Sequence, residues 1–158
     1  MKKIVIGSDK SGFTLKEAIK AHLIEQGYEV EDVGTTDPEN PKGYVVTAPL
    51  LAKKISSGEY EKGILCCGTG MGMAITANKF PGVYAAVCQT LAQVHYARAI
   101  NNANVLTMGG WILGPEAGIA MTDEFLKTEF LVGLEDWRQV NLTKAFQTLQ
   151  ETEKELYK

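Results

Sequence analysis

The sequence predicts an α/β protein with a parallel sheet that helices cover on both faces, and two observations lead to this prediction. Short apolar runs rich in Val and Ile alternate with longer stretches in which apolar residues recur at helical spacing. Most of the short runs are apolar, as expected for parallel strands covered on both faces. There are five such runs, so we expect five strands in one domain spanning positions 1–158.

The candidate strands are separated by intervals that leave room for a helix. They are Lys3–Gly7, Tyr28–Val33, Gly63–Cys67, Val83–Val87 and Val105–Met108. Leu15, Ile19 and Leu23 recur at helical spacing before Gly27, a typical helix end. The next predicted helices are Val46–Ser57, Gly72–Lys79, Leu91–Ile100 and Pro115–Thr128. Right-handed crossovers then bring the carboxyl ends of all strands to one edge, where ligands bind in such sheets.

The last predicted helix, about 141–157, is polar and carries only a thin apolar stripe. The stripe consists of Leu142, Ala145, Phe146, Leu149 and Leu156. Such a helix either packs on its own domain or docks on a second subunit. The pattern leaves both interpretations open.

The composition limits the partners of the protein. A net charge of −3 with dispersed lysines gives no basic surface for nucleic acid. No apolar run approaches the roughly 20 residues that a membrane span needs, and the first residues do not predict a signal peptide. Two of the three cysteines are adjacent, which makes a poor disulfide framework. We therefore expect a cytoplasmic protein that binds neither nucleic acid nor a membrane.

A glycine-rich turn follows the third predicted strand. Gly68, Gly70 and Gly72 let the backbone bend tightly, and the turn leads into a helix, so several N–H groups can converge on an anion. The turn lacks the Lys-Ser/Thr of a nucleotide P-loop, and Met73 replaces the third glycine of the dinucleotide motif. A purely structural turn is the alternative interpretation.

Cys67 ends the strand before this turn. A thiol beside a helix N-terminus ionises readily, and a thiolate facing converging amides suits proton abstraction next to a carbonyl. Cys66 should point to the opposite face and serve packing. The alternative for Cys67 is an inert buried cysteine. No CxxC pair and no nearby His indicates a metal site.

The first strand ends in a second polar segment at the same edge. Asp9 could bind sugar hydroxyls and Lys10 a phosphate. Alternatively, Asp9 or Ser11 caps the following helix and Lys10 lies in solvent.

Several motifs together resemble one known family. They are Ile-Gly-Ser-Asp at 6–9, Asp-Val-Gly-Thr at 32–35, Gly-Ile-Leu-Cys-Cys-Gly-Thr-Gly-Met-Gly at 63–72, Ala-Asn-Lys-Phe-Pro-Gly-Val at 77–83, Asn-Asn-Ala-Asn-Val-Leu at 101–106 and Gly-Gly-Trp-Ile-Leu-Gly at 109–114. The chain resembles the ribose-5-phosphate isomerase B / galactose-6-phosphate isomerase family over nearly its whole length. The resemblance implies a Rossmann-like three-layer α/β/α sandwich with an extended C-terminal helix. It also implies a homodimer or dimer of dimers with active sites at the interface, and no metal or organic cofactor.

The resemblance assigns roles to individual residues. Cys67 matches the cysteine that moves the proton between C1 and C2, and Thr69 matches the hydroxyl that assists proton movement on the oxygens. The loop that holds the enediolate corresponds to Gly68, Gly70, Met71 and Gly72.

Other matches concern substrate binding. Asp9 matches the acid that binds sugar hydroxyls, and Asn101 matches an asparagine that contacts the sugar. Tyr44 falls where the family has the tyrosine of Asp-Tyr-Pro, although the segment here is Gly-Tyr-Val. Phosphate binding would rest on Lys10 and Arg138, from different subunits of the dimer.

Departures from the family pattern concern ring opening and phosphate binding. The pentose-phosphate isomerases carry a His before the asparagine that Asn101 matches, and this chain has Ile100. Trp111 and Leu134 stand in place of two phosphate-binding arginines. The histidines of the chain, His22 and His95, are expected on exposed helix surfaces.

Ile100 suggests a substrate that needs no ring opening. A tetrose 4-phosphate cannot close a five-membered ring, because its C4 oxygen is esterified. The sequence therefore predicts an aldose–ketose isomerase of a short phosphorylated sugar, acting through a cis-enediolate. The alternatives are a non-catalytic subunit of a hetero-oligomeric isomerase, such as the galactose-6-phosphate type, and a nucleotide-binding α/β module.

Overall fold

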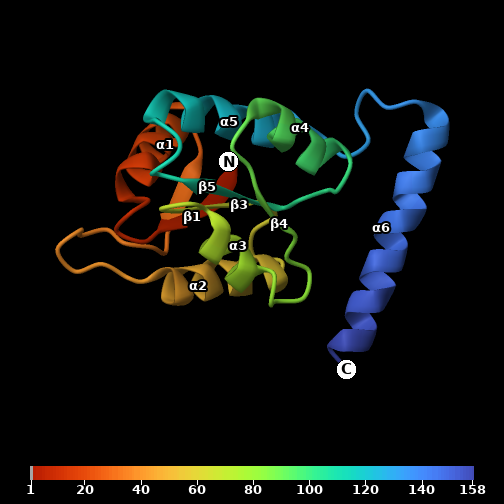
Figure 1. Cartoon of the computed structure of the whole chain (residues 1–158), viewed down its shortest axis with the longest axis horizontal. Coiled ribbons are helices and arrows are strands. Elements are labelled where there is room, and N and C mark those ends of the chain that lie inside the picture. Colours follow the sequence, from red (N-terminus) through yellow and green to blue (C-terminus); the bar gives the residue numbers. More distant parts are fainter. Residues whose placement is uncertain (1) are drawn as a thin grey trace.

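Five parallel strands and six helices form a three-layer α/β/α structure (Figure 1). It is a computed structural model that describes residues 2–158. The strands are β1 Lys3–Ser8, β2 Glu29–Asp32, β3 Gly63–Cys67, β4 Ala85–Val87 and β5 Val105–Gly109. The helices are α1 Phe13–Glu25, α2 Tyr44–Ser56, α3 Met71–Ala77, α4 Leu91–Ala99, α5 Pro115–Lys127 and α6 Asp136–Leu156. The predicted fold class and strand–helix alternation are confirmed.

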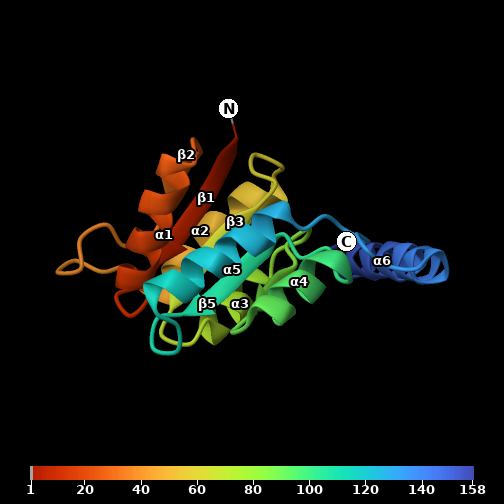
Figure 2. The same cartoon turned by 90° about the horizontal axis from the view of Figure 1, so that it is seen from above.

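The strand order is β2-β1-β3-β5-β4, with every neighbouring pair parallel. Helices α1, α4 and α5 cover one face of the sheet, and α2 and α3 cover the other (Figures 1 and 2). The chain therefore leaves β1 toward one face and β3 toward the opposite face. Diverging connections of this kind open a crevice at the carboxyl ends of the two strands, where ligands bind in open α/β sheets.

Two apolar cores lie on the two faces of the sheet, and strand alternation divides β3 between them. Ile64 and Cys66 pack with α1, α4 and α5, whereas Leu65 and Cys67 pack with α2 and α3. The adjacent cysteines thus point to opposite faces, as the sequence predicts. Cys66 is fully enclosed, and burial raises the pKa of its thiol.

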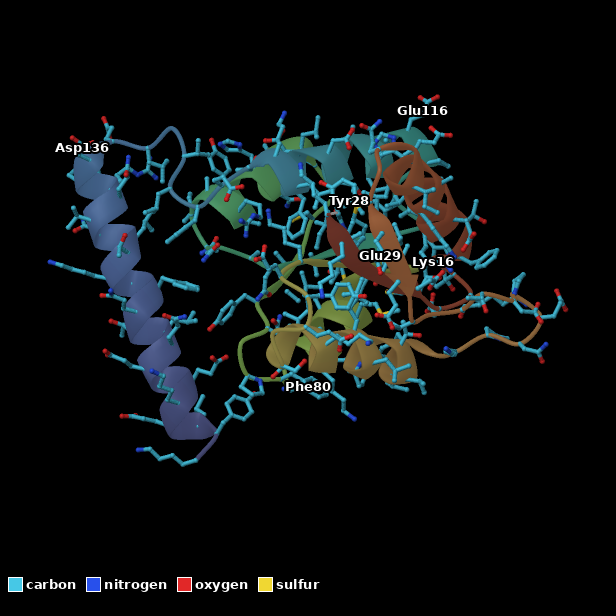
Figure 3. All side chains as sticks on the ribbon, turned by 180° about the vertical axis from the view of Figure 1, so that it is seen from behind. Lys16, Tyr28, Glu29, Phe80, Glu116 and Asp136 are labelled. Carbon is cyan, nitrogen blue, oxygen red and sulfur yellow. The ribbon has the colours of Figure 1, made fainter. Side chains whose placement is uncertain are left out.

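The last helix, α6, begins at Asp136, earlier than the sequence pattern predicted. Asp136 lies in the first turn, where a carboxylate interacts favourably with the helix dipole, so the helix extends beyond its apolar stripe. It projects away from the three layers, with Asp136 far from the sheet (Figures 1, 2 and 3). Phe146 contacts the ring of Tyr84, and Glu153 accepts a hydrogen bond from the Gly82 N–H. No α6 residue is buried, so most of its stripe has no partner in this chain.

A buried ion pair ties α1 to the end of β2. The Lys16 side chain is 1% exposed, and its ammonium contacts Asp32 Oδ2 at 2.6 Å and Glu17 Oε1 at 2.7 Å (Figure 3 labels Lys16). The ammonium also donates to the Thr35 carbonyl oxygen. The Thr35 hydroxyl in turn accepts the Lys42 N–H at 3.0 Å. This network holds both ends of the loop that leads into α2 and thus places Tyr44.

Opposing effects act on the Asp32 carboxylate. Burial alone raises the pKa of Asp32, but hydrogen bonds from Lys16, Lys20 and the Gly34 N–H outweigh it and lower the pKa overall. A lowered pKa in the folded state stabilises the protein above the ordinary aspartate pKa. That stabilisation disappears as the pH falls through the lowered value.

We predict that Lys16→Met destabilises the fold by about 3–5 kcal/mol, because it leaves Asp32 buried without its main partner. Urea unfolding followed by circular dichroism measures the change. Lys20→Met is the matched control: Lys20 also contacts Asp32, at 3.0 Å, but is partly exposed, so its loss should cost about 1 kcal/mol or less. Equal effects of the two substitutions would contradict the importance of the buried pair.

Candidate active site

The backbone of the glycine turn after β3 contacts the sulfur of Cys67. Gly70 has φ +79°, a left-handed conformation, and its N–H donates to Cys67 Sγ at 3.0 Å. A Cβ on Gly70 would come within 3.0 Å of the Met108 backbone. Cys67 is 5% exposed. The turn therefore holds a backbone N–H in hydrogen-bond contact with the sulfur of Cys67.

Other N–H groups of the glycine turn are available to bind a ligand. Those of Gly68, Thr69 and Gly72 donate to no protein group within residues 2–158. The Met71 N–H is already used, because it donates to the Thr69 hydroxyl oxygen at 3.2 Å. Free amides beside a sulfur base are what an enediolate oxygen requires.

Two aromatic rings flank the glycine turn. A Cβ on Gly68 would lie 2.7 Å from three atoms of the Trp111 ring, and a Cβ on Gly72 would lie 2.9 Å from the Tyr44 ring. The Trp111 N–H donates to the Gly68 carbonyl oxygen at 3.0 Å, which fixes the turn after β5 on the turn after β3. Trp111 is nevertheless 74% exposed. The sequence singled out Trp111 only because it stands where the family has a phosphate-binding arginine. The position of its ring against Gly68 depends on the pairing of β3 with β5.

The turn after β1 packs directly beside Cys67. Gly12 lies so close to the backbone of Cys66 and Cys67 that a Cβ there would overlap it. Asp9 Oδ1 accepts the Gly12 N–H at 3.0 Å, which closes the turn before α1. Gly12 itself precedes the helix and no side chain caps α1, so the capping interpretation of Asp9 or Ser11 is wrong. Asp9 Oδ2 has no partner within the described residues, and Lys10 is exposed next to it. Asp9 and Lys10 thus lie at the same edge as the sulfur.

Two of the predicted substrate-binding residues lie elsewhere in the chain. Asn101 follows α4 and precedes β5, which places it at the amino ends of the strands, opposite Cys67. With Ile100 it lines a groove of about 380 Å³ between β4 and α6. Arg138 lies in the first turn of α6. One chain therefore does not bring Asn101 or Arg138 to Cys67.

Comparison with known proteins agrees with this geometry. A model of the Ribose/Galactose Isomerase family matches residues 4–142. The chain belongs to this family. It is 54% identical over 156 residues to the 4-deoxy-4-sulfo-D-erythrose isomerase of Clostridium sp. strain MSTE9, covering 99% of this chain and 98% of that protein.

A second relative and a solved structure extend the comparison. The D-erythrulose-4-phosphate isomerase of Pectobacterium atrosepticum is 40% identical over 132 residues, which cover 82% of this chain and 86% of that protein. The structure of Clostridium thermocellum ribose-5-phosphate isomerase B superposes with a TM-score of 0.87 at 37% identity. That match covers 98% of this chain and 99% of the other. The protein is therefore an aldose–ketose isomerase that acts on small sugars.

Both histidines of this isomerase are engaged away from the sulfur. His22 contacts Asp123 at 2.7 Å, and His95 contacts Glu124 at 2.9 Å. Hydrogen bonds from Lys127, and then from His95 and Thr128, outweigh burial and lower the pKa of Glu124 to about 2. These pairs join α1 and α4 to α5, on the sheet face opposite Cys67. The structure thus provides no histidine beside the glycine turn.

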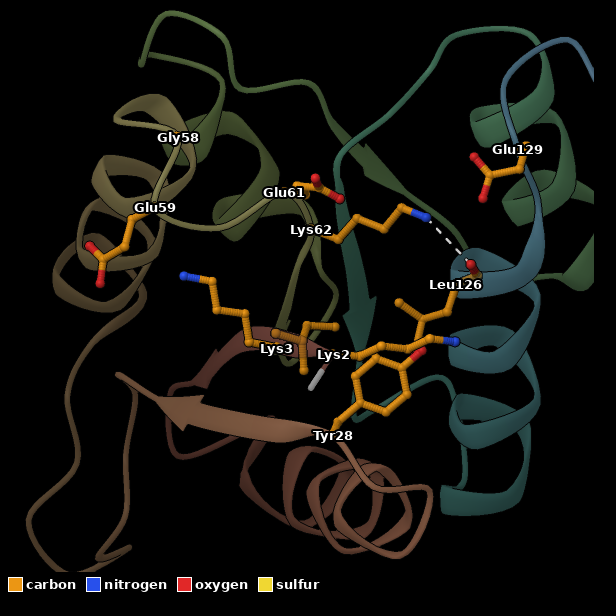
Figure 4. A pocket seen from close by; sticks show the side chains of 10 residues that line it. Lys2, Lys3, Tyr28, Gly58, Glu59, Glu61, Lys62, Leu126 and Glu129 are labelled. Carbon is orange, nitrogen blue, oxygen red and sulfur yellow. Dashed lines mark hydrogen bonds between the residues drawn. The ribbon is translucent and has the colours of Figure 1, made fainter.

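Four cavities of about 380–630 Å³ lie away from Cys67. One of about 490 Å³ lies at the amino ends of the strands, lined by Lys2, Lys3, Tyr28 and Lys62 among others (Figure 4). There the Lys62 ammonium donates to the Leu126 carbonyl oxygen at 3.3 Å. Within residues 2–158 no group of three or more His, Cys, Asp or Glu side chains is placed to hold a metal, and no helix is long and apolar enough to cross a membrane. Cys67 itself is buried, and the exposed rings of Trp111 and Tyr44 lie next to the turn that follows it.

We predict that Gly70→Ala lowers isomerase kcat/KM at least about tenfold, because the strained residue moves the N–H that contacts Cys67. The left-handed conformation should also cost about 1–2 kcal/mol of stability. Steady-state kinetics and thermal unfolding measure the two effects.

Gly58→Ala is the matched control. Gly58 has φ +76°, but a Cβ there would meet nothing within 4 Å, and it lies far from Cys67. We expect a similar loss of stability with normal turnover. If both variants kept normal turnover, the turn would not be needed for catalysis.

Proposed function

We propose that this isomerase interconverts the aldose and ketose forms of an open-chain four-carbon sugar that carries an anionic group on C4. The observation that carries the proposal is Ile100, an apolar residue where a ring-opening histidine would stand. A tetrose whose C4 lacks a free hydroxyl cannot close a five-membered ring, so it needs no such acid or base. Relatives named for a sulfonated erythrose and for erythrulose 4-phosphate support a four-carbon substrate.

In the proposed mechanism the Cys67 thiolate removes the proton from C2 of the aldose. The electrons of the C–H bond form the C1–C2 double bond of a cis-enediolate, and the negative charge moves to the oxygen on C1. The free N–H groups of Gly68, Thr69 and Gly72 stabilise this oxygen. The Thr69 hydroxyl carries the proton from the C2 oxygen to the C1 oxygen. The Cys67 thiol then returns its proton to C1, which gives the ketose.

Asp9 and Tyr44 complete the half of the site that belongs to the same chain. The unpaired oxygen of Asp9 accepts hydrogen bonds from sugar hydroxyls. The Tyr44 ring borders the glycine turn at Gly72, and the adjacent Met71 is exposed at the start of α3. Lys10 attracts the anionic end of the substrate.

The other half of the site comes from a second subunit. Asn101 lies at the edge opposite Cys67 and Arg138 lies on the projecting helix α6, so both would serve catalysis in a neighbouring copy. The exposed part of the α6 stripe provides the surface for a two-fold dimer, or a dimer of dimers, in which α6 docks on the partner. Such a dimer would also cover the glycine turn that follows Cys67, which removes water from the enediolate. Free cysteines and a thiolate base suit the reducing cytoplasm.

We predict that the purified protein isomerises D-erythrose 4-phosphate or 4-deoxy-4-sulfo-D-erythrose with deuterium incorporation from solvent, and turns over ribose 5-phosphate at least about 100-fold less efficiently. Cys67→Ala should lower turnover and exchange by a factor of about 10²–10⁴, because the base is lost. Proton NMR in deuterium oxide follows both the turnover and the deuterium exchange. Ribose 5-phosphate turnover equal to that of a tetrose would overturn the substrate assignment.

Cys66→Ala is the control for the base assignment, because Cys66 adjoins Cys67 but faces the other core. The Cys66→Ala variant should be somewhat less stable than the wild-type protein but should still catalyse deuterium exchange into the substrate. Turnover by the purified protein alone also separates this proposal from a subunit that needs a paralogous partner.

A complementation experiment tests the shared site. Cys67→Ala and Asn101→Ala should each be inactive or strongly impaired as homodimers. When the two variants are refolded together in equal amounts, half of the dimers should contain one chain of each kind. Each of these mixed dimers holds one intact site out of two, so about a quarter of wild-type activity should return. A mixture no more active than its components would show that Asn101 does not act across the dimer.

A further inference from the structure

The Trp111 ring lies at the carboxyl edge of the sheet on a turn whose backbone is fixed. The ring covers Gly68, but most of its surface stays exposed. Its turn is fixed at several points: the Gly110 N–H donates to the Cys67 carbonyl oxygen at 2.7 Å, and the Leu113 N–H donates to Gly109 at 2.9 Å. A ring placed only for packing would be largely buried. Trp111 therefore presents an exposed apolar wall at Gly68, the residue that follows Cys67.

This wall adjoins the segment that carries Lys10. A Cβ on Gly110 would lie 2.5 Å from the Ser11 carbonyl oxygen, so the turn after β5 packs on the turn after β1. A substrate that reaches Cys67 and extends toward Lys10 therefore passes the face of Trp111. With Cys67 acting at C2 and Lys10 binding the anion, as proposed, the C4 end of a four-carbon chain would point in this direction.

Few cations can meet an anion there. Lys16 is occupied by Asp32 and Glu17, and the Lys42 ammonium donates to the Val33 carbonyl oxygen. Of the two arginines in the sequence, Arg98 is buried at the opposite edge and donates to backbone carbonyls of Thr128 and Ala103. Lys10 in one subunit and Arg138 in the partner are the remaining candidates.

A site with so few cations distinguishes a phosphate on C4 from a sulfonate on C4. A phosphate monoester carries about −1.5 to −2 charges at pH 7, whereas a sulfonate carries −1. Removing a dianion from water against an apolar ring costs more than removing a monoanion. A sulfonate bound directly to C4 also lacks the bridging ester oxygen, so it is shorter and fits a narrower site.

We propose, on the basis of the proposed function, that Trp111 is a specificity-determining residue that makes the isomerase prefer a C4 sulfonate to a C4 phosphate ester. The 54% identical relative named for a sulfonated erythrose is consistent with this preference.

The test compares kcat/KM for 4-deoxy-4-sulfo-D-erythrose and D-erythrose 4-phosphate. Wild-type protein should favour the sulfonate at least about tenfold. Trp111→Arg should reduce this ratio at least about tenfold, mainly by lowering the KM for the phosphate, because a guanidinium binds a phosphate dianion bidentately. Trp111→Phe should keep the preference.

Ile24→Arg is the control for added charge, since Ile24 is exposed on α1 away from the site and should leave the ratio unchanged. Thermal unfolding checks that the variants fold. A wild-type preference for the phosphate, or an unchanged ratio in Trp111→Arg, would overturn the role of Trp111 while leaving tetrose isomerisation intact. Failure of the wild-type protein on both tetroses would refute the proposed function itself.

Discussion

Close backbone packing of three turns at the carboxyl edge of the sheet is the constraint on which the site depends. The turn after β3 lies between the turns after β1 and β5, and glycines stand at the contacts. Gly12 touches the backbone of Cys66 and Cys67, and a Cβ on Gly109 would lie 2.7 Å from the Gly68 carbonyl oxygen. Larger residues at these positions would push the turns apart. The sulfur of Cys67 would then lose the amide of Gly70 that now contacts it.

The direction of the chain divides the proposed site between two subunits. In a parallel α/β sheet the helices return to the amino edge, so residues that follow a helix start from the edge opposite the catalytic turn. Asn101 lies in such a segment, and Arg138 lies on the projecting helix α6. The proposed homodimer would solve this topological problem and cover α6 at the same time. In that proposal the dimer is part of the catalytic design.

Stability and function use different charged groups in this isomerase. Lys16 and Asp32 form a buried pair whose role is to place the loop before Tyr44, and Glu124 links α4 and α5 through His95. Lys10 and Arg138 have no carboxylate partner among the described residues. Leaving these two cations unpaired keeps them available for an anionic substrate.

The sequence by itself determined the sheet, the helices and the family, because buried parallel strands, helical periodicity and glycine turns are local patterns. It also placed Cys66 and Cys67 on opposite faces, since strand alternation is a property of the backbone. Only the tertiary structure decided that Trp111 lies on Gly68 and that Asp9 has one free oxygen, because both depend on strand pairing between distant segments. The same holds for the separation of Asn101 from Cys67, which follows from the direction of the chain through the fold.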